Sequence, residues 1–381
     1  MKRLNILIII FLSVNVLLAQ KMNVPEFLKK IHEPKSLSGF HILPHTPPMN
    51  QDTTSACWAF ATTSFLESEM QRLGQDTVRL SMMFPFFHAY VEKMRRFVQT
   101  HGKSRVAPGG LFPDVTDIVQ KYGIVPYRAY PGLPKGRARY NQHALYRAID
   151  SLKKEVKALQ IWDEDLVLQK TREILYKYMG VPPQSFTYKG LVYTPQSFLK
   201  KIVRLPWKDY LMVTSFEYAP YFQFTELKVP DNWAHNKHYF NVPLKLFYQS
   251  IKNALKRGYP VAFDADISEP GRIGKYDVSF IPPYDIPGKY IDAEAREYRF
   301  KGGLTTDDHL MLFLGYQRHH GNDWFLVKDS WRDAWQGKFK GYFLDHGDYV
   351  KLKVLAFLVN KNAIPEITKH LPEKTLPNPT K

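Results

Sequence analysis

The chain contains a single cysteine in 381 residues, Cys57, and this residue stands at the start of an apolar pattern with helical spacing. The pattern begins at Trp58, reaches Leu73 and stops at Gly74, so the sequence predicts a buried helix that begins at Cys57. A thiol at a helix N-terminus lies at the positive end of the helix dipole, which favours the thiolate. Gln51 lies six residues earlier, close enough to turn its amide toward the same point as an oxyanion donor. Cys57 is therefore a candidate nucleophile, although a lone cysteine is more commonly a small buried hydrophobe.

Two polar residues far downstream supply the partners that a cysteine nucleophile needs. His309 follows Asp308 and precedes the apolar run 310–316, which is typical of a strand. Asp329 comes twenty residues after His309, inside a second apolar stretch at 324–331. A cysteine on a helix, a histidine on a strand and a polar residue on a later strand can form a nucleophile, a base and a group that orients the base.

Four short motifs around these residues resemble the signatures of papain-like cysteine peptidases, in the order that the family has. They are Gln51, Cys57-Trp58-Ala59-Phe60, Asp308-His309 and Lys328-Asp329-Ser330-Trp331. Further stretches are similar to the bleomycin hydrolase and aminopeptidase C branch of that family, at 178–183, 194–198, 229–233 and 239–244. Together, and in order, the motifs cover most of the chain and give a strong signal.

The resemblance implies an α+β, papain-like fold with two lobes. The Cys57 helix would belong to a helical lobe and would face an antiparallel β lobe across a cleft. A strand-like pattern at 261–359 fits the β lobe. Within a peptidase domain at 20–365, the segment 133–228 looks like a helical insertion, and it carries one long helical pattern at 148–179.

The resemblance also implies catalytic roles for individual residues. The reaction would be peptide hydrolysis by acyl transfer, with Cys57 as the nucleophile and His309 as the proton donor to the leaving amine. Gln51 and the backbone N–H of Cys57 would stabilise the oxyanion. Asp329 would orient His309, and Trp331 would shield their contact from water.

On the substrate side, the resemblance points to Gly109 and Gly110, which would line the cleft and hydrogen-bond the peptide backbone. An ordinary turn is the alternative for this glycine pair. In the relatives, the chain's own C-terminus lies in the cleft and restricts cutting to peptide ends, which implies an aminopeptidase with peptide substrates. Here residues 366–381 carry several Pro and Lys residues and are predicted to form a flexible tail.

Three positions depart from the family pattern. Asp329 stands where the family usually has asparagine, Arg332 replaces a glycine after the tryptophan, and Ser55 replaces a glycine before the cysteine. A carboxylate can still orient an imidazole and favours its protonated form, and Arg332 could neutralise that carboxylate. These departures leave a second hypothesis open, in which the chain is an inactive papain-like protein that binds peptides.

The net charge of +17 raises a third hypothesis, a basic nucleic-acid-binding protein. The basic residues are spread along the whole chain and form no recognition-helix or zinc-finger pattern, so we do not expect nucleic acid as a partner. The bleomycin hydrolase resemblance makes a homo-oligomer with a basic inner surface an open alternative. His235 with His238, and Asp264 with Asp266, have metal-like spacing but no full ligand set, so we expect no metal and no cofactor.

The first 19 residues have the pattern of an export signal. Lys2 and Arg3 give a positive start, the next 16 residues are mostly apolar, and Ala19 offers a small-residue cleavage point before Gln20. An uncleaved membrane anchor is the alternative, but the apolar run is shorter than the roughly 20 residues of a spanning helix. The sequence therefore predicts export to the periplasm or the extracellular space, with no intramolecular disulfide.

Overall fold

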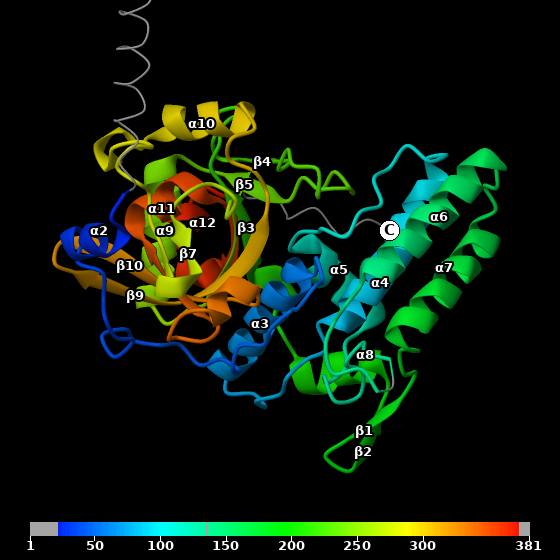
Figure 1. Ribbon diagram of the computed structural model, residues 1–381. Helices are drawn as coiled ribbons and strands as arrows, with labels where there is room; N and C mark the ends of the chain where they lie inside the picture. The colour runs from blue at the N-terminus through cyan, green and yellow to red at the C-terminus, as the bar shows by residue number, and fades with distance from the viewer. Residues whose placement is uncertain (1–21, 135, 373–381) are drawn as a thin grey trace, which may run out of the picture.

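The computed structural model describes residues 22–134 and 136–372, which form two lobes with the helix α3 between them (Figure 1). The expected export signal at 1–19 lies outside these residues. One lobe is helical, and the other is a large sheet covered by shorter helices, so the expected α+β architecture is observed.

The helical lobe is built from five long helices and a small hairpin with a short helix after it. These elements are α3 (Cys57–Arg72), α4 (Met83–Gln99), α5 (Pro113–Tyr122), α6 (His143–Ala158), α7 (Glu164–Met179), β1 (Phe186–Tyr188), β2 (Leu191–Tyr193) and α8 (Pro195–Phe198). As expected, α3 begins at Cys57, and the chain turns away at Gly74, whose φ of +69° favours glycine. Most of α3 is buried because it packs against α4 and α5 on one side and against the sheet on the other.

The predicted long helix at 148–179 is wrong in one respect, because the structure has two helices there, α6 and α7. Asp163 ends the connection between them, and its side chain accepts a hydrogen bond from the backbone N–H of Leu166 at 2.9 Å. Gln160, just after α6, has a φ of +53°, which a continuing helix does not allow. The apolar pattern hid this break because no glycine or proline marks it.

The second lobe is a ten-stranded sheet with the order β4-β5-β3-β12-β6-β9-β10-β11-β8-β7. Its strands are β3 (Tyr210–Thr214), β4 (Gln223–Thr225), β5 (Tyr239–Asn241), β6 (Val261–Ala265), β7 (Arg272–Ile273), β8 (Val278–Ser279), β9 (His309–His319), β10 (Asn322–Lys328), β11 (Tyr342–His346) and β12 (Val354–Asn360). Most neighbouring strands are antiparallel, whereas β3 with β5 and β8 with β11 are parallel. The helices of this lobe are α2 (Val24–Lys30), α9 (Leu244–Lys256), α10 (Ala293–Lys301), α11 (Gly347–Lys353) and α12 (Pro365–Thr368).

Two boundaries differ from the sequence prediction. The insertion was expected to run to residue 228, but β3 lies between β5 and β12 inside the main sheet, so the added helical segment ends before Tyr210. The flexible tail was expected to begin at Glu366, but α12 covers that residue and buries Ile367 completely. Of the predicted tail, residues 373–381 lie outside the part of the chain that the structure describes.

Candidate active site

Cys57 is the first residue of α3 and is 9% exposed. The turn before it is held by side chains: the Thr54 hydroxyl donates to the carbonyl of Gln51 at 3.1 Å and accepts from the N–H of Ala56 at 3.3 Å. The Gln51 side-chain amide donates to the carbonyl of Thr54 at 2.9 Å. These bonds fix the relative positions of Gln51 and the N-terminus of α3, so the structure brings together the two residues that the sequence paired.

His309 begins β9, and Asp329 follows β10, the antiparallel neighbour of β9. This pairing places the two side chains side by side, with His309 Nε2 at 2.7 Å from Asp329 Oδ1. The same carboxylate oxygen accepts the backbone N–H of Trp331 at 2.8 Å. Both side chains are almost fully buried, so the hydrogen bond between them is shielded from water.

The charges of this pair stabilise each other. Burial alone lowers the pKa of His309, but the Asp329 carboxylate and then the neighbouring Cys57 side chain outweigh burial and raise the pKa to about 10. Burial alone raises the pKa of Asp329, but the charges of His309 and Arg272 hold it well below its usual range. The site therefore favours an imidazolium beside a carboxylate, which is the state that can give a proton to a leaving group.

Arg272, at the start of β7, is a residue of this site that sequence reasoning missed. Its guanidinium pairs with Asp329 and with Asp333, the latter at 2.8 Å from Nε, and its side chain is only 2% exposed. The hypothesis that Arg332 neutralises Asp329 is wrong, because Arg332 instead lies over the ring of Trp331 at 5.4 Å from its centroid. No local pattern marks Arg272, because the contact joins residues that are far apart in the sequence.

Gln51, the expected oxyanion donor, is held in place by hydrogen bonds. It is 1% exposed, and its Oε1 accepts a hydrogen bond from the Ser330 hydroxyl at 2.6 Å. Its backbone N–H also donates to the carbonyl of Ser330 at 2.8 Å, so both lobes hold this residue. The Thr54 carbonyl takes one of the two hydrogens on Nε2, and the other is left for a group in the adjoining cavity.

A cavity of about 480 Å³ brings most of the predicted residues together. It is lined by Gln51, Cys57, Gly109, Gly110, His309 and Trp331. The Trp331 ring lies 6.1 Å from the His309 ring between centroids, at the position expected for a shield. Asp329 does not line the cavity, because it lies behind His309.

The two glycines on the cavity wall have no room for a side chain. A Cβ on Gly109 would lie 1.6 Å from Oδ2 of Asp231, and a Cβ on Gly110 would lie 2.7 Å from Oδ2 of Asp114. The backbone of both glycines therefore runs close to these carboxylates, and both glycines line the cavity. Three acidic residues that the sequence did not assign to the site, Asp231, Asp307 and Asp308, also line the cavity, together with the basic residue Arg105.

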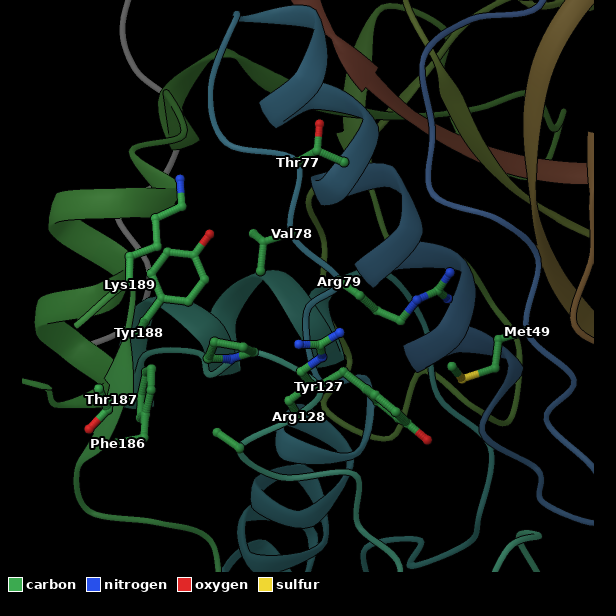
Figure 2. A pocket seen from close by; sticks show the side chains of 12 residues that line it. Met49, Thr77, Val78, Arg79, Tyr127, Arg128, Phe186, Thr187, Tyr188 and Lys189 are labelled. Atoms are coloured by element: carbon green, nitrogen blue, oxygen red, sulfur yellow. The ribbon is translucent and has the colours of Figure 1, made fainter. Parts of the chain in front are cut away.

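A larger cavity, of about 830 Å³, lies elsewhere and contains none of the predicted residues (Figure 2). It opens between the β1–β2 hairpin and the segments 77–79 and 126–129. Figure 2 shows Tyr188 and Lys189 of the hairpin on one side and Arg79 on the other. This hollow has no nucleophile and base pair in its lining, so the smaller cavity is the candidate active site.

Within residues 22–134 and 136–372, no three His, Cys, Asp or Glu side chains gather where they could hold a metal ion. His235, one member of a metal-like pattern, pairs with Glu226 at 2.7 Å. The helices of the described residues include none with the length and apolarity needed to cross a membrane.

Comparisons with known proteins agree on one family. Residues 26–379 match the model of the Peptidase C1-like family. Aminopeptidase C of Lactobacillus delbrueckii subsp. lactis is 24% identical over 87% of this chain and 83% of its own length. Bleomycin hydrolase of Mus musculus is 20% identical over 86% of this chain and 83% of its own length.

Among solved structures, PepW from Lactobacillus rhamnosis HN001 (DR20) has a similar fold. The TM-score is 0.68 at 18% identity, over 94% of this chain and 93% of PepW. At this identity the similarity concerns the fold alone.

Proposed function

The chain belongs to the Peptidase C1-like family of cysteine-type peptidases, and from this premise we propose that it is an exported aminopeptidase that uses Cys57, His309 and Asp329. The observation that carries the proposal is the arrangement in one cavity of a helix-terminal thiol, a carboxylate-bound imidazole and the Gln51 amide. Relatives named aminopeptidase C and aminopeptidase E support cleavage at the amino end of peptides.

The proposed reaction is an acyl transfer in two halves. The Cys57 thiolate attacks the carbonyl carbon of the scissile bond, and the negative charge that forms on oxygen is stabilised by the Gln51 amide and the Cys57 backbone N–H. As the C–N bond breaks, the His309 imidazolium gives its proton to the leaving amine. A water molecule then loses a proton to His309 and attacks the thioester, the C–S bond breaks, and the thiolate returns.

Asp329 and Arg272 support this reaction without touching the substrate. Asp329 holds His309 by the 2.7 Å hydrogen bond and stabilises its positive charge. Arg272 neutralises Asp329, so a carboxylate in place of the family's asparagine does not leave an uncompensated buried charge. This compensation argues against the hypothesis of an inactive peptide-binding protein.

Turnover of fluorogenic aminoacyl amides by the wild type and by Cys57→Ser tests the proposal. We expect Cys57→Ser to lose at least about 10³-fold in kcat/KM, since a nucleophile is removed. Ser64→Ala, on the same helix but outside the cavity lining, is the matched control and should keep its turnover. We expect N-acetylated substrates to be cleaved much more slowly than free amines.

A folded wild type that cleaves none of these substrates would overturn the peptidase proposal and favour the peptide-binding hypothesis. Equal cleavage of acetylated and free substrates would instead make it an endopeptidase. The export part of the proposal rests on the sequence of residues 1–19. Determining the first residue of the mature protein, which we expect to be Gln20, tests it.

A further inference from the structure

The candidate active-site cavity has an acidic side that the proposed mechanism does not use. Asp307 lies two residues before His309, and Asp231 lies against Gly109 on the opposite lobe's wall. Both line the same cavity as Cys57. Two carboxyl groups therefore share this cavity with the proposed nucleophile, and one of them lies against Gly109.

A third carboxyl lies directly behind this wall. Asp264, on β6, is completely buried, and neither of its oxygens has a hydrogen-bond partner among the described residues. It lies within hydrogen-bonding reach of Asp307, whose own Oδ2 is buried and equally without a partner in the described part of the chain. One of these carboxyls can donate a hydrogen bond to the other only while it holds a proton, so the pair has no donor when both are ionised.

The neighbouring residues fix the position of Asp307. Asp308 accepts hydrogen bonds from the backbone N–H groups of Ile267 and Ser268, and its other oxygen accepts from Thr306 at 2.7 Å. The backbone N–H of Thr306 donates to Asp266 at 2.6 Å. The loop is thus anchored on both sides of Asp307, while Oδ2 of Asp307 is buried without a hydrogen-bond partner among the described residues.

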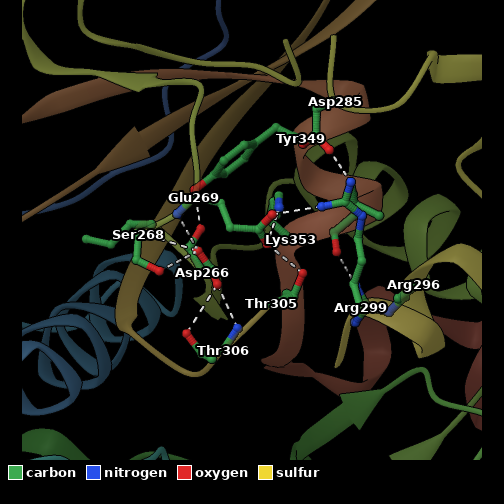
Figure 3. Close-up of polar contacts among 12 residues, drawn as sticks. Asp266, Ser268, Glu269, Asp285, Arg296, Arg299, Thr305, Thr306, Tyr349 and Lys353 are labelled. Atoms are coloured by element: carbon green, nitrogen blue, oxygen red, sulfur yellow. Dashed lines mark hydrogen bonds and ion pairs between the residues drawn. The ribbon is translucent and has the colours of Figure 1, made fainter. Parts of the chain in front are cut away.

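Figure 3 shows how this anchor continues into the sheet lobe. Glu269 pairs with the fully buried Lys353 and with Arg299, and it accepts the Thr305 hydroxyl at 2.7 Å. Arg299 also pairs with Asp285. In this network each charged group has an opposite charge within reach, in contrast to Asp264 and Asp307.

The cations near the cavity do not compensate for the two unpaired carboxyls. Lys93 donates to the carbonyls of Ala107 and Gly109, and Arg105 lies 3.7 Å from Asp231. Burial, and then the charge of Asp231, raise the pKa of Asp307 to about 8. Asp264 and Asp307 are therefore largely protonated near neutral pH, and a positive group that binds beside them would favour their ionised form.

We propose that Asp231 and Asp307, with Asp264 behind them, form a carboxylate subsite, ionised when occupied, that binds a positively charged amine of the substrate next to the scissile bond. The proposal deepens the proposed function and rests on it. The amine has two sources, which are the α-ammonium group of a peptide and the side chain of a lysine or arginine. In the first case the subsite makes the enzyme an aminopeptidase, and in the second it selects a basic side chain.

The test replaces Asp307 with asparagine, which keeps the size of the side chain and removes its ability to ionise. The readout is the ratio of kcat/KM for a free aminoacyl substrate to kcat/KM for its N-acetylated form. A second ratio compares acetylated dipeptide substrates that carry lysine or leucine before the cleaved residue. Asp165→Asn, an exposed aspartate on α7, removes the same charge elsewhere and is the matched control.

We expect one of the two ratios to fall at least about tenfold in Asp307→Asn, the size typical of a lost charged hydrogen bond. A fall in the first ratio identifies the α-ammonium group as the ligand, and a fall in the second identifies a basic side chain. Asp231→Asn should act in the same direction. Equal losses for all substrates, or unchanged ratios in both variants, would overturn the subsite.

A binding measurement separates failure of the subsite from failure of the proposed function. Leucinamide and lysinamide are titrated calorimetrically into Cys57→Ser and into the Cys57→Ser/Asp307→Asn double variant. Binding that weakens at least about tenfold in the double variant supports the subsite even where the wild type shows no turnover. Turnover by the wild type, with amide binding that does not depend on Asp307, would leave the peptidase standing and remove the subsite.

Discussion

At the scale of single residues, the distinctive feature is an ion pair where the family usually places a neutral amide. Asp329 carries a full charge and forms an ion pair with the buried Arg272. This ion pair joins β7 to the loop after β10. Because Arg272 also pairs with Asp333, it links three segments of the sheet lobe behind His309. The orientation of His309 therefore depends on a charge network rather than on a single hydrogen bond.

Replacing Asp329 with asparagine should move the alkaline limb of the pH–rate profile to lower pH. Burial lowers the pKa of His309, and the Asp329 carboxylate is the strongest of the interactions that raise it to about 10. Without that charge, His309 loses its proton at lower pH, and turnover that needs the imidazolium declines earlier. The measurement is kcat/KM from about pH 6 to about pH 11.

Asp333→Asn is the control for this shift. It removes a carboxylate from Arg272 but leaves the hydrogen bond between His309 and Asp329 in place. Its alkaline limb should move far less than that of Asp329→Asn. An unchanged limb in Asp329→Asn, or equal shifts in the two variants, would contradict the electrostatic role of the carboxylate.

The sequence located Cys57, His309, Asp329 and Gln51 because each lies in a short stretch whose order along the chain is informative. It could not locate Arg272, whose partner is 57 residues away in the sequence and adjacent only once the sheet has formed. Asp307 lies two residues before His309 in the sequence, but the sequence does not show that its Oδ2 lacks a hydrogen-bond partner among the described residues, because this depends on packing. Local pattern therefore gave the candidate reacting groups, and tertiary contact gave the groups around them.

At the scale of elements, α12 shows how a polar-looking segment can be ordered by its contacts. This four-residue helix lies against α9, where Glu366 accepts from Asn253 at 2.8 Å and pairs with Arg257 at 3.0 Å. Ile367 inserts into the main core. Composition predicted a flexible tail from Glu366, because one buried isoleucine among prolines and lysines has no periodic pattern.

Shortening Ile367 to alanine should lower the free energy of unfolding by about 2–5 kcal/mol, as is usual for a buried isoleucine. The side chain is fully buried, and its removal leaves a cavity between α12 and the sheet lobe. Urea unfolding of the full chain measures the change. Ile42→Ala, at a site where the side chain is 39% exposed, is the control and should cost less than about 1 kcal/mol.

A loss below about 1 kcal/mol for Ile367→Ala would show that α12 is not docked in solution. The expectation of a flexible segment from Glu366 onward would then hold after all. The m-value of urea unfolding distinguishes the two outcomes. If α12 is not docked in solution, it takes no part in the main transition, and the substitution leaves that transition unchanged.

At the scale of the whole molecule, the chain crosses between lobes just before the nucleophile. The segment leading to α3 is attached to the sheet lobe by two hydrogen bonds. The backbone N–H of Leu43 donates to the carbonyl of Leu314, and Nε2 of His45 lies 2.7 Å from the Tyr342 hydroxyl. Cys57 then starts the central helix of the other lobe. The two-lobe division was predictable, whereas the share of the sheet built from β3, β4 and β5 was not, because these strands are short.

The stability of the whole molecule should fall as the pH rises from about 7 to about 8.5. Burial raises the pKa of Asp345 to about 7 and, together with the charge of Asp231, raises that of Asp307 to about 8, while burial raises that of Asp264 well above its ordinary value. Unfolded aspartates have already lost these protons near pH 4, so ionisation costs stability only in the folded state. Each proton held only by the folded state contributes a slope of about 1.4 kcal/mol per pH unit.

His309 adds to this slope, since its raised pKa stabilises the fold below about pH 6.5 and the benefit is lost toward pH 10. Two groups act in the opposite direction. Burial lowers the pKa of His88 to about 4, so His88 opposes the slope only below about pH 7. Burial lowers the pKa of Lys328 to about 8, so Lys328 opposes the slope from about pH 8 upward, at the upper end of the window.

Thermal unfolding midpoints across this pH range measure the effect. Asp345→Asn should flatten the lower part of the curve, because it removes one of the buried acids. A midpoint that rises or stays constant from about pH 7 to about pH 8.5 would contradict the predicted charge states of the buried carboxyls.

The single thiol in the lining of the cavity also determines how the molecule responds to oxidants. Peroxide converts an active-site thiolate to a sulfenic acid, which many proteins rescue by forming a disulfide with a second cysteine. This chain has no second cysteine, so recovery depends on a reductant from outside, and further oxidation of Cys57 is irreversible. In an oxidising compartment, the active lifetime of the molecule is then set by the supply of external thiols rather than by the stability of its fold.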